Sequence, residues 1–350
     1  MIPTLFNSGL VGKPSSGGGA VGGWVELART TLGSAGDTIT VSSLPDKRYY
    51  MILADTPATG GAIYQGLRVN NDSGSNYAIR KSYNSGADAT YTSTSQIQFM
   101  GNAFDTPIFG VGYLSNLSSK EKLFIAHSVA QSTAGSGTSP VREEQSNKWS
   151  NTSDAVNRFD LRNTSAGSYA TNSEVVVLGW DESDTHTTNF WEELGSADWV
   201  SGSSLPTVSF TAKKYLWVQC WTSGGIGGDG ANRVSIRVGN GSIDTSSNYS
   251  FRNSESGGAD STSTSDTYWL THTGNKKNYM NMFIINNASN EKLAIYHTSE
   301  AANGASNAPT RIEGVGKWAN TSNQINRLSV FDNTGGNNFD AGTVKIWGSD

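Results

Sequence analysis

Apolar and polar residues alternate in short runs along the whole chain. Thr38–Ser42 alternates strictly, with Ile39 and Val41 at every second position, which is typical of a strand with one buried face. Longer apolar runs at 49–53 and 282–285 predict central strands that are covered on both faces. No stretch of ten or more residues keeps the 3.6-residue period of an amphipathic helix. The pattern therefore predicts an all-β protein.

Turn-forming clusters separate these runs. Segments such as 70–74 (Asn-Asn-Asp-Ser-Gly) and 333–336 (Asn-Thr-Gly-Gly) combine residues that tolerate the left-handed backbone region. Their spacing predicts about eight to ten strands in each half of the chain, which is typical of a β-sandwich with a jelly-roll-like arrangement.

The chain contains two copies of one sequence unit. Residues 140–158 and 309–327 are identical at ten of nineteen positions without a gap, at an offset of 169 residues. Further matches follow in the same order at offsets between 169 and 172, and they pair Asn76–Arg80 with 248–252, Gly86–Asp88 with 258–260, and Glu121–Leu123 with 291–293. Ordered self-similarity of this kind indicates a tandem duplication.

The duplication predicts four parts of the chain. Residues 1–23 form an N-terminal arm, 24–181 the first β-sandwich, 182–189 a polar linker, and 190–350 the second β-sandwich. The Gly/Ser-rich end of the arm is typical of a flexible tether. The beginning of the arm is either an apolar anchor or an ordinary frayed terminus. The anchor residues would be Ile2, Leu5, Phe6, Leu10 and Val11.

Composition and charge narrow the function classes. Of the 350 residues, 40 are Gly and only 16% are charged, which disfavours long surface helices, while 10 Trp, 13 Tyr and 12 Phe indicate a packed core. The net charge is −5 and no dense basic run occurs, so nucleic acid is not expected as a partner. No membrane-spanning segment and no secretory signal is recognisable, so we expect folding in a cytoplasm and no membrane partner.

Few residues offer reactive or metal-binding chemistry. Cys220, the single cysteine, lies in an apolar run and is expected to be a buried, inert thiol. His127 and His297 occupy matching positions of the two copies, and without a His/Cys cluster we expect them to be packing residues at strand ends. The sequence predicts no cofactor and no metal site, although Ca²⁺ binding by Asp/Asn-rich loops such as 71–73 stays open.

No catalytic residues are predicted. The chain lacks a Gly-x-Ser-x-Gly elbow and a P-loop. The neighbouring carboxylates Glu143 and Glu144, like Glu192 and Glu193, would point to opposite faces of a strand, which makes them poor candidates for a glycosidase pair. We therefore expect a protein that is not an enzyme.

A Lys-Trp-x-Asn-Thr-Ser motif followed by Asn-Arg is the most specific signal that both copies share. It has two interpretations: a structural corner, in which the Asn side chain forms a turn between strands, or a glycan-binding platform built on the Trp. In the corner interpretation, we expect Arg158 to stack on Trp149. The six residues are Trp149, Asn151 and Arg158 in the first copy and Trp318, Asn320 and Arg327 in the second.

The end of the second copy resembles β-rich structural proteins of tailed bacteriophages, especially marine ones. The resemblance rests on Gly316–Ser322, Ile325–Arg327 and Phe339–Gly348, with a looser version at Glu174–Asp181 in the first copy. It implies a jelly-roll-like fold, a place on the surface of the virion, a trimer or another symmetric homo-oligomer, and no cofactor. The expected partners are other capsid proteins and copies of the chain itself.

Three functions remain open at this point. The first is a capsid decoration or head-fibre subunit that acts by binding alone. The second is a tail-associated fibre or adhesin that binds host glycans through aromatic residues such as Trp149 and Trp318. The third is a double jelly-roll shell protein, in which the duplication lets one chain fill two similar positions.

Overall fold

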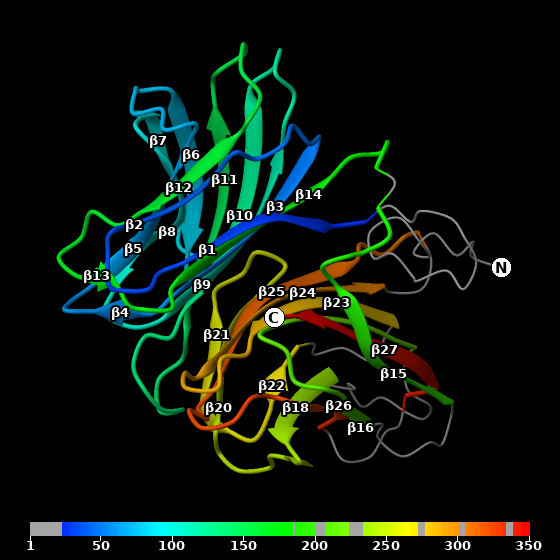
Figure 1. Cartoon of the computed structure of the whole chain (residues 1–350). Coiled ribbons are helices and arrows are strands. Elements are labelled where there is room, and N and C mark those ends of the chain that lie inside the picture. Colours follow the sequence, from blue (N-terminus) through cyan, green and yellow to red (C-terminus); the bar gives the residue numbers. More distant parts are fainter. Residues whose placement is uncertain are drawn as a thin grey trace. The chain divides into compact units, whose positions relative to one another are not determined.

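Strands and turns make up the described part of the chain (Figure 1). The computed structural model describes residues 23–184, 186–200, 207–223, 234–271, 277–301, 305–333 and 339–350. These residues form 27 strands and no helix, and therefore contain no helix that could cross a membrane. The predicted all-β class is confirmed. Residues 1–22, and with them the predicted apolar anchor, lie outside the described residues.

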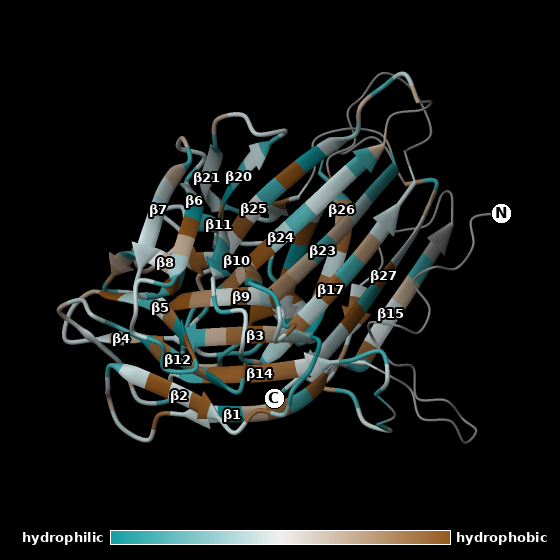
Figure 2. Ribbon diagram, turned by 90° about the horizontal axis from the view of Figure 1, so that it is seen from above, coloured by the Kyte–Doolittle hydropathy of each residue, from teal (hydrophilic) through white to brown (hydrophobic). Residues whose placement is uncertain are grey.

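An eight-stranded antiparallel sheet is the larger layer of the first repeat. Its strands lie in the order β1 (Val25–Thr31), β14 (Glu174–Trp180), β3 (Tyr49–Thr56), β9 (Ile108–Ser115), β10 (Lys122–Ala130), β11 (Val141–Trp149), β6 (Tyr77–Tyr83) and β7 (Ala89–Thr94). The central strand β3 is buried from Tyr50 to Thr56, as its long apolar run predicts. Figure 2 shows β3 and β14 as the mainly hydrophobic strands and β7 as a paler one.

The smaller layer of the first repeat has four strands. They lie in the order β2 (Thr38–Ser42), β12 (Arg158–Arg162), β5 (Ile63–Val69) and β8 (Ile97–Phe104), and a two-stranded sheet adds β4 (Ala58–Thr59) and β13 (Ser168–Tyr169). In β2, Ile39 and Val41 are buried while Thr38 and Ser42 are exposed, which confirms the predicted alternation. Aromatic side chains of different strands meet in the core, where Phe99 and Phe124 pack edge to face at 5.1 Å.

The second repeat has the same architecture. Its large sheet has the order β15 (Glu192–Val200), β27 (Ala341–Ser349), β17 (Tyr215–Thr222), β23 (Lys277–Ile285), β24 (Lys292–Ala301), β25 (Thr310–Trp318), β20 (Tyr249–Glu255) and β21 (Ser261–Asp266). Its small sheet contains β16 (Thr207–Ser209), β26 (Arg327–Asp332), β18 (Val234–Asn240) and β19 (Ser242–Ile243), and β22 (Trp269–Leu270) pairs with β18. Val218, Ile236, Trp269 and Ile346 belong to one buried cluster to which both sheets contribute.

The two large sheets correspond strand by strand. Trp149 pairs with Tyr77 at the end of β11, and Trp318 pairs with Tyr249 at the end of β25. Because strand order and register agree, the repeats are two β-sandwiches of one topology. Each is antiparallel and jelly-roll-like.

The compact units do not follow the sequence boundaries everywhere. The first unit runs to Ala130 and continues with Glu143–Glu192, while the second contains Gln131–Arg142 and Glu193–Asp350. Phe190, where the sequence places the start of the second copy, belongs to the first unit because its backbone N–H donates to the carbonyl oxygen of Trp24 at 2.8 Å. The segment Gln131–Arg142 is held in the second unit by ion pairs and hydrogen bonds, described below.

The number of strands exceeds the expectation of about eight to ten in each repeat. The described residues form β1–β14 in the first repeat and β15–β27 in the second. Several of the extra strands have only two residues, and β7 and β21 are polar throughout most of their length. An edge strand needs no buried face, and polar side chains protect it from aggregation. Such strands therefore lack the hydrophobic alternation that predicts a strand.

We predict that Gly112→Ala destabilises the first unit by about 1–3 kcal/mol, since it overpacks the core. A Cβ atom at Gly112 would lie 2.6 Å from Cε2 of Phe124 and 2.8 Å from Cε1 of Phe99. The free energy of unfolding, measured by urea denaturation, checks this. Gly33→Ala is the matched control, because no atom lies within 4 Å of a Cβ there. Equal stability of the two variants would contradict the proposed packing.

Candidate functional site

The shared motif forms a buried corner in the first repeat. Trp149 ends β11, and its indole N–H donates to Oδ2 of Asp72 at 2.7 Å. Its ring lies nearly parallel to that of Tyr77, with the centroids 6.4 Å apart. Asp72 also accepts hydrogen bonds from the backbone N–H of Gly74 and the side-chain amide of Asn76. Burial acts to raise the pKa of Asp72, but these three hydrogen bonds together with the positive charge of Arg68 outweigh it, and the pKa is lowered.

A buried lysine lies under the tryptophan ring. Nζ of Lys122 is 5.2 Å from the centroid of Trp149 and donates to the carbonyl oxygens of Ser118 at 3.1 Å and Asn151 at 2.9 Å. The side chain is buried, and burial lowers its pKa. The carbonyl oxygens and the face of the indole ring replace the water that a charged ammonium would otherwise need.

Asn151 makes the turn that follows the buried tryptophan. Its side-chain oxygen accepts the backbone N–H groups of Ser153 and Asp154, both at 2.8 Å, which is an Asx turn. Val156, after this turn, donates its backbone N–H to the side chain of Asn116 at 3.0 Å. Side-chain amides therefore determine the path of the chain from β11 to β12.

The second repeat builds the same corner. The indole N–H of Trp318 donates to Asp244 at 2.8 Å, and Asn320 accepts the backbone N–H groups of Ser322 at 3.0 Å and Asn323 at 2.9 Å. Nζ of Lys292 lies 5.6 Å from the centroid of the Trp318 ring.

Carbonyl oxygens surround the ammonium of Lys292. It donates to those of Asn320 at 2.7 Å, Asn290 at 2.9 Å and Ala288 at 3.3 Å. Burial lowers the pKa of Lys292 to about 8, although the neighbouring Glu291 carboxylate acts in the opposite direction. One lysine thus connects two turns of the second repeat.

One of the two interpretations of the motif, the glycan platform, is wrong, and so is one expected contact. Trp149 and Trp318 are buried, so neither offers an exposed ring on which a sugar could stack. Arg158 does not stack on Trp149 but pairs with Asp160, two residues along the same strand, at 2.7 Å. In the second repeat, Arg327 donates to the backbone oxygen of Asn326 at 2.8 Å. The cation beside each tryptophan is the lysine at the start of the neighbouring strand.

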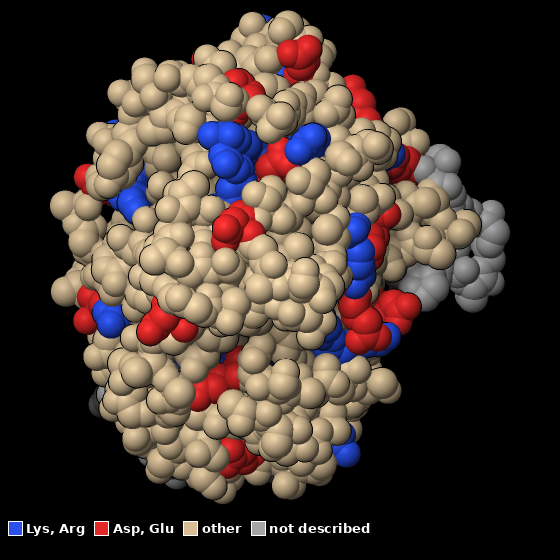
Figure 3. Space-filling view, turned by 60° about the vertical axis from the view of Figure 1, so that its left-hand side comes forward, with Lys and Arg blue, Asp and Glu red and all other residues tan. Residues whose placement is uncertain are grey.

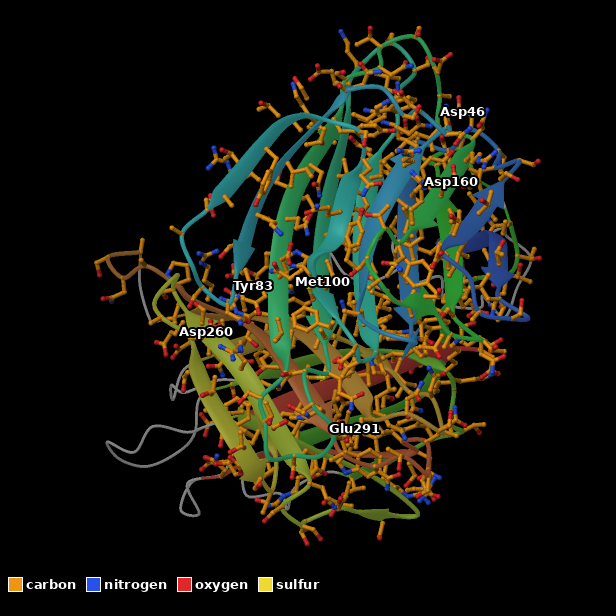
Figure 4. The ribbon with its side chains drawn as sticks, turned by 90° about the vertical axis from the view of Figure 1, so that its left-hand side faces the viewer. Asp46, Tyr83, Met100, Asp160, Asp260 and Glu291 are labelled. Atoms are coloured by element: carbon orange, nitrogen blue, oxygen red, sulfur yellow. The ribbon has the colours of Figure 1, made fainter. Side chains whose placement is uncertain are left out.

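A second concentration of charged groups lies where the second unit holds the segment Gln131–Arg142, which we call the docking segment. The guanidinium of Arg142 contacts Oδ1 of Asp260 through Nη2 at 2.9 Å and through Nε at 3.0 Å. Arg252 contacts the other oxygen of Asp260 at 3.3 Å and donates from Nε to the carbonyl oxygen of Pro140 at 2.9 Å. Figure 4 labels Asp260, which precedes β21.

The start of the docking segment is held by backbone contacts. Nζ of Lys317 donates to the carbonyl oxygens of Thr133 at 2.6 Å and Gln131 at 3.1 Å. Glu291, also labelled in Figure 4, accepts the backbone N–H of Gly135. Ser136 donates its hydroxyl to the carbonyl oxygen of Ser247 at 2.7 Å. These contacts explain why residues 131–142 belong to the second unit.

The remaining candidates have packing environments. Cys220 is buried, as predicted, and burial raises the pKa of its thiol to about 12. His127 and His297 lie half-buried within β10 and β24, not at strand ends. Glu143 is buried and pairs with Lys81 at 3.0 Å, while Glu144 on the other strand face is half-buried. No group of three or more His, Cys, Asp or Glu that could hold a metal occurs within the described ranges.

Comparisons with known proteins leave the chain without an assigned family. No family model matches it, and no curated protein does. One similar solved structure is the LG1–3 region of the laminin α2 chain, with 10% identity and a TM-score of 0.20; the match covers 89% of this chain and 64% of that one. Another is LG4–5 of the mouse laminin α1 chain, with 8% identity, a TM-score of 0.18 and coverage of 95% and 84%. Likenesses this distant carry no argument about function.

We predict that Lys292→Met destabilises the second unit by about 1–3 kcal/mol, because buried carbonyl acceptors lose their donor. Thermal and urea unfolding of the full chain measure the effect. Lys120→Met, at an exposed position, is the control and should leave stability unchanged. A Lys292→Met chain as stable as the wild type would mean that the ammonium is not needed in the corner.

Acid should weaken the second unit through His297. Burial and the guanidinium groups of Arg142 and Arg311 lower the pKa of His297 to about 4. In the unfolded chain a histidine has a pKa of about 6.5, so on acidification the unfolded state binds a proton at a higher pH than the folded state does. Unfolding therefore becomes more favourable as the pH falls from about 6.5 to 4. His297→Gln should lose less stability than the wild type over that range in urea titrations. Identical pH profiles would contradict this assignment.

Proposed function

We propose that the chain is a non-enzymatic structural protein on the surface of a bacteriophage particle, most simply a capsid decoration or head-fibre subunit. Its mechanism is binding alone, to other capsid proteins and to copies of itself. The proposal combines the resemblance of residues 316–348 to phage structural proteins with the roles of the repeated motif. In both repeats the repeated Lys, Trp and Asn side chains hold turns together, and such a construction suits a rigid surface module.

The chemistry of the described residues supports a role without catalysis. The Cys220 thiol has a pKa of about 12, which leaves it protonated at neutral pH, where it is a weak nucleophile. Lys122 and Lys292 have their ammonium groups committed to backbone carbonyls. The thiol of Cys220 and the ammonium groups of these two lysines thus have structural environments.

The surface charge suits binding to proteins better than binding to nucleic acid. On the face drawn in Figure 3, Lys and Arg lie in small groups next to Asp and Glu, among many uncharged residues. A nucleic-acid surface needs clustered cations that neutralise phosphates. Mixed charges instead give pairwise complementarity between protein surfaces.

The burial of two tryptophans favours the decoration role over the adhesin. A glycan-binding adhesin was expected to use Trp149 and Trp318, and both are buried. The shell-protein alternative stays distinguishable by experiment, because a shell protein assembles into closed particles on its own and a decoration protein needs a preformed shell.

The anchoring arm provides the test. Deletion of residues 1–23 in the phage genome should remove the protein from purified particles, because the arm carries the apolar anchor. Mass spectrometry of the particles measures its content, and circular dichroism of the purified variant should show unchanged β structure. Replacement of Gly17, Gly18 and Gly19 by Ser is the control and should preserve incorporation, since Gly and Ser tracts are both flexible. Normal incorporation of the truncated chain would overturn the anchoring role.

A further inference from the structure

The charged residues that hold the docking segment in the second unit have counterparts in the first unit. Duplication places the same residue types at the same strand positions, and we call the first-unit set the acceptor face. The counterparts are Arg80 for Arg252, Asp88 for Asp260, Glu121 for Glu291 and Lys148 for Lys317.

The acceptor face is exposed, whereas its counterpart is covered. Arg80 and Asp88 pair with each other at 3.1 Å with 62% and 51% of their side chains exposed, against 20% and 5% for Arg252 and Asp260. Lys148 and Glu121 pair at 3.0 Å with 45% and 42% exposed, against 0% and 4% for Lys317 and Glu291. The same four residue types therefore surround a bound segment in one unit and face solvent in the other.

The docking segment is itself duplicated. Its last three residues, Pro140-Val141-Arg142, correspond to Pro309-Thr310-Arg311 in the second repeat. Arg142 is buried against Asp260, while the side chain of Arg311 is 60% exposed and contacts Glu313 at 2.5 Å. The chain thus presents a second arginine of the same kind at its surface.

Apolar residues beside the acceptor face show the same contrast. Leu123 and Ile125 on β10 are more than half exposed. Their counterparts on β24, Leu293 and Ile295, are buried. Exposed large aliphatic side chains next to a charged surface are a common feature of protein-binding sites.

We propose that the acceptor face of one chain binds the 309–311 segment of a second copy of this chain, in the manner in which the second unit holds residues 140–142. Arg311 of one copy then pairs with Asp88 of the next, and Arg80 donates to the carbonyl oxygen of Pro309. Leu123 and Ile125 lie beside this contact. The inference deepens the proposed structural role, on which it rests, by naming the surface through which copies associate.

Such a contact joins two different surfaces of the chain. It is therefore heterologous, and each added copy again has one free 309–311 segment and one free acceptor face. Contacts of this kind build a closed ring or an open filament. Exposed ion pairs contribute little by themselves, but the same charges become effective when a partner covers them and satisfies their hydrogen bonds. We expect the association to weaken as salt is added.

Charge reversal and its compensation test the proposal on the full-length chain. Asp88→Lys places two cations opposite each other, and Arg311→Glu places two anions opposite each other. Each single variant should raise the dissociation constant at least about a hundredfold, since both disrupt a charge pair that the partner covers. The double variant Asp88→Lys/Arg311→Glu restores an opposite-charge pair and should regain association. Sedimentation velocity over a concentration series measures the assembly state.

Controls separate assembly from folding and from the proposed function. Asp37→Lys, an exposed substitution of the same charge change before β2, should associate like the wild type. Circular dichroism and melting curves should show that all variants are folded. A monomeric wild type, single variants that assemble normally, or a double variant that remains monomeric would each overturn the proposed contact. None of these results bears on incorporation into particles, which the arm deletion tests separately.

Discussion

A buried ammonium group is the constraint on which each sandwich depends most. Lys122 and Lys292 lie beneath a tryptophan ring and donate to backbone carbonyls of two separate turns. A charge can stay buried only while its hydrogen bonds are satisfied, so the two turns cannot separate without exposing or stranding it. The Asx turn at Asn151 then directs the chain from the large sheet into the small one. One lysine thereby fixes both ends of a strand connection.

The two repeats show that charged side chains of the same type at the same strand position make different contacts. Lys148 and Lys317 occupy the same strand position. The exposed Lys148 pairs with Glu121, whereas the buried Lys317 donates to the carbonyl oxygens of Gln131 and Thr133 and also lies 3.8 Å from Glu291. In solvent, screening and side-chain entropy cancel most of the attraction. Under a covering segment, the same ammonium becomes a directional donor in a low-dielectric site. The roles of the two lysines differ because a segment covers one strand and not the other, and this depends on the tertiary structure.

Much of the fold could be predicted from residue periodicity and self-similarity. The alternation at Thr38–Ser42 and the apolar run before Thr56 each predict a strand from local residues alone. An alternating pattern indicates one buried face, and a continuous apolar run indicates two. Strands β7 and β21 could not be found this way, since an edge strand gains its order from backbone pairing with its neighbour and carries no apolar pattern.

The candidate site was less predictable, for a physical reason. Whether Trp149 is a platform or a core residue depends on Asp72 and Lys122, which come from distant parts of the chain. One signal was available locally: Arg158 and Asp160 are two residues apart, share a strand face and pair. From the strand alternation one could have predicted that Arg158 pairs with this aspartate and not with the indole ring.

The two repeats carry the same set of charged residues, but a segment of the chain covers this set in the second unit alone. The second unit holds residues 131–142, so its charged set is covered, while Arg80 and its equivalent set in the first unit pair with each other and stay exposed in the part of the chain that the structure describes. In the contact that we propose, a second copy covers the exposed set with its residues 309–311. In that proposal, the duplication gives a contact that stabilises one chain a second use between chains.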